Sequence, residues 1–327
     1  MLSRRQFVAR SVSLGAASSL SLGASAQAAF PAKPIRIVVP FGAGGVADLT
    51  ARTVAQKMAE GLGQSIVIEN KPGAGGVVAA DTVAKAEPDG HTLFLMSNGT
   101  AVSEGLFKKL PFDSRKDFAP VSVLGFFDLV IVVSESSRFK TLAELVAFAK
   151  TSPGKLNIGT VAIGSTQNLA AELFKSSAGI DVQVVPFNGT PAVVTALRGG
   201  QIDAAVEILA PVSTQISAKA LRALAVMGDE RAPSLAAVPT VREAAGLARF
   251  SVASWNALAA PARTPREVVL RLNREVQVAL KSPEVKKRLA DLGVEARPST
   301  PEQLATLLDD EIKRWSAVIT RAGIPRQ

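Results

Sequence analysis

The chain has 327 residues, with 37 lysines and arginines against 28 aspartates and glutamates, and its formal net charge is +9. It has one histidine, His91, and no cysteine, which excludes histidine-rich metal centres, thiolate metal sites and cysteine nucleophiles. The basic residues are spread along the chain without a run, so we expect no nucleic-acid partner. The length suffices for one large or two medium-sized α/β domains.

Residues 1–28 have the features of an export signal. Three arginines precede an apolar stretch rich in Ala, Ser and Leu that is too short to span a bilayer. The pair Arg4-Arg5 lies in a context similar to a twin-arginine signal, although an ordinary secretory signal also accommodates it. We therefore expect export to the periplasm, with cleavage near Ala26–Ala29.

Residues 35–48 are the most informative segment of the chain. A buried strand, Ile35 to Val39, leads into a glycine-rich turn and then into the first turn of a helix. An apolar face continues this helix through Val54 and Met58 to Leu62. Such a unit directs backbone N–H groups and the positive end of a helix dipole toward a crevice, and this predicts an anion site.

The next elements complete a β-α-β-α-β order. Strands are expected over 66–69 and 92–96, a helix over 77–86, and glycine-containing loops over 73–76 and 97–100. This order predicts a parallel, doubly wound sheet. Its loops lie at the carboxyl ends of the strands, where such sheets bind ligands.

A second α/β set follows in the middle of the chain. Strands are expected over 129–133, 156–159, 182–186, 202–206 and 221–226. Gly164-Ser165-Thr166 and Asn188-Gly189-Thr190 precede helices, as the glycine loops of the first set do. The tail is expected to be helical, with helix starts after Thr264, Ser282 and Thr300, each followed by proline.

Two apolar stretches, 121–127 and 251–260, are long enough to carry the chain between domains. Two crossings make one domain discontinuous. We expect lobe I to comprise 29–123 and 255–327, lobe II to comprise 124–254, and a hinge to close the lobes on a ligand.

The glycine loops allow two interpretations. Gly42-x-Gly44-x-x-Ala47 fits a relaxed dinucleotide fingerprint, and Glu69 ends the second strand where a ribose-binding acid belongs. An exported nicotinamide-dependent oxidoreductase is thus the alternative function. However, Glu69 lies 27 residues after Gly42, no catalytic acid–base set is evident, and similar loops recur in the second half. Free N–H groups and small hydroxyls on both sides of a cleft suit a carboxylate.

The motifs of this chain resemble those of the Bug-type extracytoplasmic solute receptors, the substrate-binding subunits of tripartite tricarboxylate transporters. The resemblance runs from about Phe30 to the C-terminus. It implies a two-lobed type II periplasmic-binding-protein fold of class α/β, with doubly wound sheets joined by a two-segment hinge. The motifs that carry it include Pro34–Phe41 with Gly44-Gly45-x-x-Asp48, Glu69–Gly76, Pro88–Leu93, Lys108–Asp113 and Gly199–Asp203.

The resemblance also implies which residues bind the ligand. The expected set is drawn from two loops of lobe I and three segments of lobe II. Ala101, Asn168 and Glu207 depart from residues common in the family, which leaves the substrate open. The expected ligand-binding residues are Phe41, Gly42, Ala43, Gly44, Asp48, Ser97, Asn98, Gly99, Thr100, Gly164, Ser165, Thr166, Asn188 and Glu207.

The sequence therefore predicts a periplasmic, non-enzymatic receptor for a small organic carboxylate. Its expected partners are this ligand and the integral membrane subunits of a tripartite tricarboxylate transporter. We expect no cofactor, no metal and a monomeric state.

Overall fold

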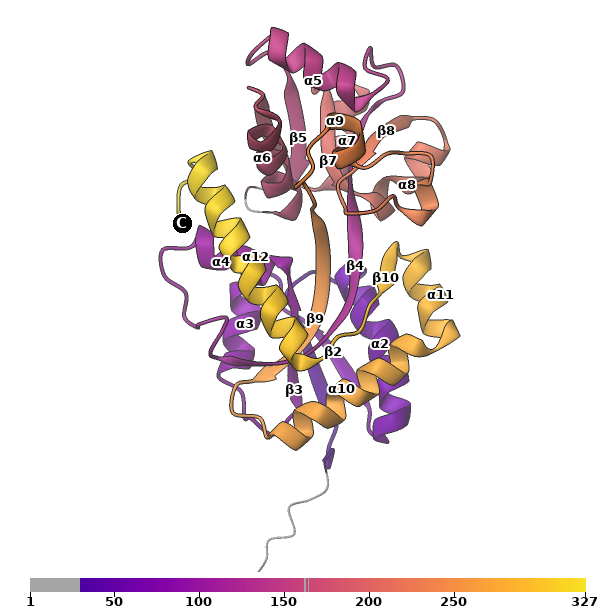
Figure 1. The fold of residues 1–327 in the computed structure, drawn as a ribbon. Helices are drawn as coiled ribbons and strands as arrows, with labels where there is room; N and C mark the ends of the chain where they lie inside the picture. The colour runs from indigo at the N-terminus through magenta and orange to yellow at the C-terminus, as the bar shows by residue number, and fades with distance from the viewer. Residues whose placement is uncertain (1–29, 162, 164) are drawn as a thin grey trace, which may run out of the picture.

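The computed structural model describes residues 30–161, 163 and 165–327 (Figure 1). The expected export signal and Gly164 lie outside these residues. In the part of the chain that is described, no helix combines the length and apolar character needed to cross a membrane. The molecule is elongated, with two α/β lobes joined by two long strands (Figure 1).

Lobe I, the lower part of Figure 1, is built on three parallel strands, as predicted from the first α/β set. The first strand is central and pairs in parallel with both of the others. Its elements in chain order are β1 (Ile35–Val39), α2 (Val46–Leu62), β2 (Ile66–Asn70), the short 3-10 helix η1 (Ala74–Gly76), α3 (Val77–Ala84), β3 (Thr92–Ser97) and α4 (Asn98–Leu106).

One boundary in this lobe differs from the prediction. Residues 97–100 were expected to form a loop, but helix α4 begins at Asn98, directly after β3. The Ser97 Oγ accepts a hydrogen bond from the Gly99 N–H at 3.2 Å, and the Thr100 Oγ1 accepts one from the Ser97 N–H at 3.3 Å. These reciprocal caps satisfy N–H groups at the start of the helix and leave no need for a loop.

The lobes are joined by two antiparallel strands, β4 (Phe118–Ser134) and β9 (Ala253–Pro261). β4 pairs with β9 from Phe118 to Asp128, and from Leu129 onward it pairs with strands of lobe II. The apolar stretches 121–127 and 251–260 therefore do link the lobes. The strand expected over 129–133 is confirmed, and it forms the second part of a 17-residue strand that begins at Phe118.

Lobe II, the upper part of Figure 1, repeats the α/β arrangement. Its elements are α5 (Leu142–Thr151), β5 (Asn157–Val161), α6 (Thr166–Ala178), β6 (Gln183–Phe187), α7 (Thr190–Arg198), β7 (Ala204–Ile208), α8 (Leu209–Ser217), β8 (Leu221–Val226), η2 (Pro233–Leu235) and α9 (Val241–Ala245). β7 pairs antiparallel with β4 and in parallel with β5, so the main path through the sheet is β2-β1-β3-β9-β4-β7-β5-β6. β8 pairs with β4 off this path.

The C-terminal segment returns to lobe I as α10 (Arg266–Lys281), α11 (Pro283–Asp291), β10 (Val294–Ala296) and α12 (Pro301–Ala322). Of the three expected hydroxyl caps, only Thr300 accepts a hydrogen bond, from the Gln303 N–H at 3.2 Å. Pro265 rather than Thr264 precedes α10, and Ser282 makes no side-chain cap.

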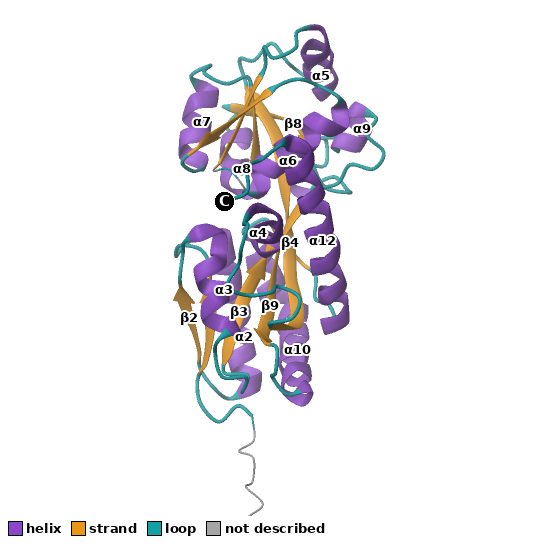
Figure 2. Cartoon of the chain, turned by 90° about the vertical axis from the view of Figure 1, so that its left-hand side faces the viewer, coloured by secondary structure: helices purple, strands orange, loops and turns teal. Residues whose placement is uncertain are grey.

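Helix α12 lies alongside the junction of the two lobes and packs on α4, β4 and α6 (Figure 2). A Cβ on Gly105 would lie 3.1 Å from the Ser316 Cα, so glycine allows α4 and α12 to approach closely. The largest apolar core follows these contacts from lobe I into lobe II and contains Trp255 and Trp315, both almost fully buried. A second core fills the α2 and α10 face of lobe I, and a third lies in lobe II.

Candidate ligand-binding site

A cavity of about 590 Å³ lies between the lobes and is lined by residues from both. The residues that precede the first turns of α2, α3, α4, α6 and α8 all line it: Gly45, Gly76, Ser97, Ser165 and Ile208. A helix N-terminus carries about half a positive charge and N–H groups that have no partner within the helix. In α4 and α6 one of these N–H groups is satisfied by the Ser97 or Ser165 cap. All described lining side chains are uncharged. The cavity is therefore electropositive through backbone dipoles, which favours an anion without any cationic side chain.

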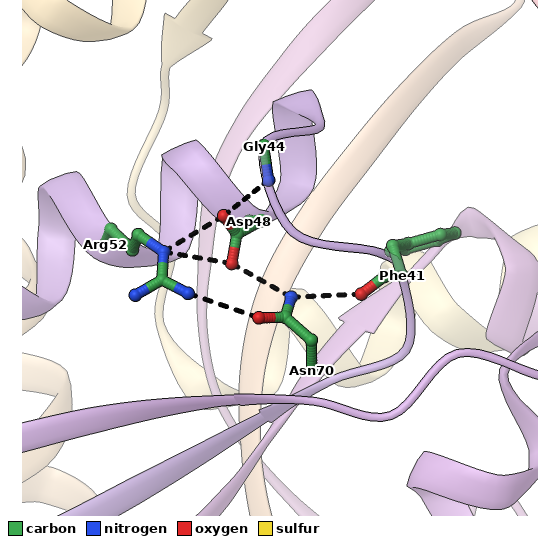
Figure 3. Close-up of polar contacts among 5 residues, drawn as sticks. All are labelled: Phe41, Gly44, Asp48, Arg52 and Asn70. Carbon is green, nitrogen blue, oxygen red and sulfur yellow. Dashed lines mark hydrogen bonds and ion pairs between the residues drawn. The ribbon is translucent and has the colours of Figure 1, made fainter.

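The loop after β1 is held in shape by Asp48 (Figure 3). Its Oδ2 accepts hydrogen bonds from the Gly44 N–H at 2.9 Å and the Arg52 Nε at 3.0 Å, and its Oδ1 accepts one from the Asn70 Nδ2 at 2.9 Å. The same Asn70 amide donates to the Phe41 carbonyl. Burial acts to raise the pKa of Asp48, but these hydrogen bonds outweigh it and lower the pKa below its ordinary value.

Of the ligand-binding residues predicted in the first loop, only one lines the cavity. Phe41 lines the cavity, whereas Gly42, Ala43 and Gly44 form an exposed part of the loop outside its lining. Asp48 is 1 % exposed, and both of its oxygens are engaged by Gly44, Arg52 and Asn70. In this structure Asp48 positions the N-terminus of α2, and it is not among the lining residues.

The first turn of α4 brings the second predicted loop to the cavity. Ser97 and Gly99 line it, while Asn98 and Thr100 are buried behind them. The Asn98 Nδ2 donates to the Thr166 Oγ1 at 3.0 Å across the lobes, and its Oδ1 accepts from the Trp315 Nε1 at 2.8 Å. Asn98 thus connects lobe I, lobe II and α12 rather than facing the cavity.

Lobe II contributes the start of α6. Ser165 and Thr166 line the cavity, and the Ser165 Oγ caps the helix by accepting from the Asn168 N–H at 3.1 Å. Asn188 is exposed and, like Glu207, lies outside the lining. Gly164, the remaining predicted member, lies outside the described residues.

Glu207 is fully buried on β7, between the starts of α6 and α7. Its Oε2 accepts a hydrogen bond from the Thr190 hydroxyl at 2.8 Å. Burial raises its pKa to about 7, against the opposing effects of Thr190, Gln167 and the Ile208 backbone. An unfolded glutamate titrates near 4.5, so between these two pH values the folded state holds a proton that the unfolded state has lost.

We therefore expect the contribution of Glu207 to the free energy of unfolding to decrease as pH rises from about 4.5 to about 7, by roughly 1–3 kcal/mol. Urea unfolding of the wild type and Glu207→Gln should give curves against pH that diverge over this window, because glutamine does not titrate. Glu87→Gln, at an exposed glutamate, is the matched control and should run parallel to the wild type. Parallel curves for Glu207→Gln would contradict the expectation.

The sequence reasoning missed several lining residues. Asn256 and Ser254 on β9 line the cavity, and Asn256 pairs in register with Ser97 across β3 and β9. Asn256 is fully buried, and neither its Oδ1 nor its Nδ2 has a partner within the described part of the chain. An asparagine inside an otherwise apolar strand was the available signal. Gln167 was also missed.

The structure gives no support to the dinucleotide alternative. Glu69 is paired with Arg36 at 2.9 Å and with Lys71 at 3.2 Å. Burial acts to raise the pKa of Glu69, but these two cations lower it overall. His91, whose Nε2 accepts from the Ala32 N–H, lies away from the cavity at the other end of β3.

Two α/β lobes joined by two long strands, with helix N-termini gathered around an interlobe cavity, define a solute-binding protein. The sequence model of a protein family, described as tripartite tricarboxylate transporter family receptor, matches residues 50–324 of this chain. The chain belongs to this family, whose members are receptors and not enzymes.

Relatives of known structure share the fold over their full length. Rpa4515 of R. palustris, in its structure with adipate, has 33% sequence identity and a TM-score of 0.80, and the match covers 91% of this chain and 100% of that one. MatC from Rhodopseudomonas palustris with bound malate has 37% identity and a TM-score of 0.76, with coverage of 89% and 100%. Compared by sequence, protein BugT of Bordetella pertussis is 35% identical over 296 residues, which are 90% of this chain and 90% of BugT.

Proposed function

We propose that this receptor binds a small organic carboxylate in the interlobe cavity. The observation that carries the proposal is the convergence of five helix N-termini on that cavity. A carboxylate accepts several charge-assisted hydrogen bonds, and backbone N–H groups and the Thr166 hydroxyl are available to donate them. The Ser165 hydroxyl holds the start of α6 in place, because it caps the helix and donates to the Val161 carbonyl at 3.3 Å. The adipate and malate bound by two relatives support the same ligand class.

We further propose that the protein is exported to the periplasm, acts as a monomer and delivers its ligand to the integral membrane subunits of a tripartite tricarboxylate transporter. Family membership supports this role. We also propose the lobe boundaries 29–123 with 255–327 and 124–254. The change of β4 partners after Asp128 lies a few residues beyond the first of these boundaries.

Thermal unfolding and calorimetry with a panel of mono-, di- and tricarboxylates test the binding proposal. A ligand present at about 100 times its Kd should stabilise the fold by roughly 2.7 kcal/mol. We expect Ser165→Ala to weaken binding, because it removes a hydroxyl from the cavity wall and the cap of α6. Thr141→Ala removes an equivalent cap from α5, whose N-terminus lies outside the lining, and should leave the Kd unchanged. If no carboxylate binds, the proposed function is wrong.

A further inference from the structure

The cavity extends along one side of α4. Its lining includes Ser97 and Gly99 at the start of this helix, and Val102, Leu106 and Phe107 along and just beyond it. At 1.5 Å per residue, the distance from Ser97 to Phe107 is about 15 Å. The end of the cavity near Phe107 is therefore well separated from the N-terminus of α4. Val102, Leu106 and Phe107 make it mainly apolar, and Ser103 and Gln327 are its polar members.

Two exposed hydrophobic side chains stand at the cavity, one from each lobe. Phe41 is 40% exposed and Ile163 is 54% exposed, and both belong to the lining. Exposing large apolar side chains to water is unfavourable unless a ligand covers them, and grouped apolar exposure marks binding surfaces. A ligand between the lobes would bury both side chains at once.

These features give the cavity two chemically different parts. The helix N-termini favour a negatively charged group. The wall along α4 offers apolar contact, and so do Phe41 and Ile163, which precede the N-caps of α2 and α6 by four and two residues. The described lining residues carry only uncharged side chains. A second carboxylate placed against this wall would lose its hydration without gaining a charged partner.

We infer that the preferred ligand is a monocarboxylate with an apolar body, whose charged end lies at the helix N-termini and whose body covers Phe41, Ile163 and the apolar side chains of α4. This inference rests on the proposed function and specifies its ligand class. Each methylene buried by the ligand should tighten binding about fourfold.

Hexanoate and adipate form a matched pair of probes, because they share six carbons and differ in one terminal carboxylate. Calorimetry should show hexanoate binding at least about tenfold more tightly than adipate, and more tightly than acetate. Adipate binding as tightly as hexanoate would overturn the inference while leaving the carboxylate receptor intact. Binding of tricarboxylates alone would have the same meaning, whereas a failure of every carboxylate would reject the proposed function itself.

Three exposed positions allow a matched test by mutation. Phe41→Ser and Ile163→Ser should each weaken hexanoate binding about five- to tenfold and change acetate binding less than about twofold. Val278→Ser is the control, because Val278 is 59% exposed on α10 and lies outside the lining. All three side chains are exposed, so the variants should fold. Equal losses for hexanoate and acetate, or no loss at Phe41 and Ile163, would overturn the inference.

Discussion

Trp315→Ala is expected to lower the free energy of unfolding by about 3–5 kcal/mol. Trp315 is fully buried on α12 in the core that extends through both lobes. Its Nε1 donates to the Asn98 Oδ1 at 2.8 Å and to the Glu311 Oε2 at 2.7 Å. Removal of the ring would leave a large cavity and two buried acceptors without this donor. Urea denaturation measures the loss.

Trp315→Phe separates the hydrogen bonds from the packing. It keeps most of the apolar volume and should cost about 1–3 kcal/mol, because the Asn98 and Glu311 oxygens lose a buried donor. A double-mutant cycle with Asn98→Ala should show coupling of at least about 0.5 kcal/mol. Additive losses would mean that the Asn98–Trp315 hydrogen bond does not stabilise the fold. A Trp315→Ala loss below about 1 kcal/mol would contradict the assigned role of the ring.

Gly125→Ala is the second change with a large expected effect, a loss of about 3 kcal/mol. Gly125 lies on β4 where β10 pairs antiparallel with it. An added Cβ would lie 2.5 Å from the Glu295 carbonyl oxygen and 2.6 Å from the Val294 Cγ1. A backbone atom cannot rotate away as a side chain does, so β10 would have to move off β4. Denaturant unfolding should show the loss in the midpoint.

Gly42→Ala provides the control for this prediction. Gly42 lies in an exposed loop with no atom within 4 Å of its added Cβ, so its replacement should change stability by less than about 0.5 kcal/mol. If Gly125→Ala were equally neutral, the close approach of β10 to β4 would not be needed for the fold.

Local sequence patterns predicted the elements near the site well. The strand from Ile35 and the helix after Gly45 follow from an apolar run, a glycine turn and an apolar helical face, and β1 and α2 confirm them. The patterns failed where tertiary pairing decided the structure. Nothing local distinguishes Val121–Phe127 from Leu129–Val133, yet continuous pairing, first with β9 and then with β7 and β8, makes them one strand.

The predicted site residues divide in a similar way. Ser97 and Ser165, which the family resemblance implied, line the cavity because each directly precedes a helix whose N-terminus faces it. Asp48 and Asn98 have the polarity of ligand-binding residues, but their partners come from elsewhere in the chain and engage them in the fold. Asn256 was missed because a polar residue in a mainly apolar strand marks an unusual position but does not show that strand pairing brings it next to Ser97.

The continuity of β4 through both lobes determines how the two halves are able to move. Lobes connected by flexible loops rotate freely, but here the two connections, β4 and β9, are strands that are hydrogen-bonded to each other where they pass between the lobes. Any rotation of one lobe must be distributed as a slight extra twist over many residues, and it is resisted by α12, which packs on both. Closure on a ligand would then be a rotation of the lobes through a small angle, and the lobes would return to their open position when the ligand leaves.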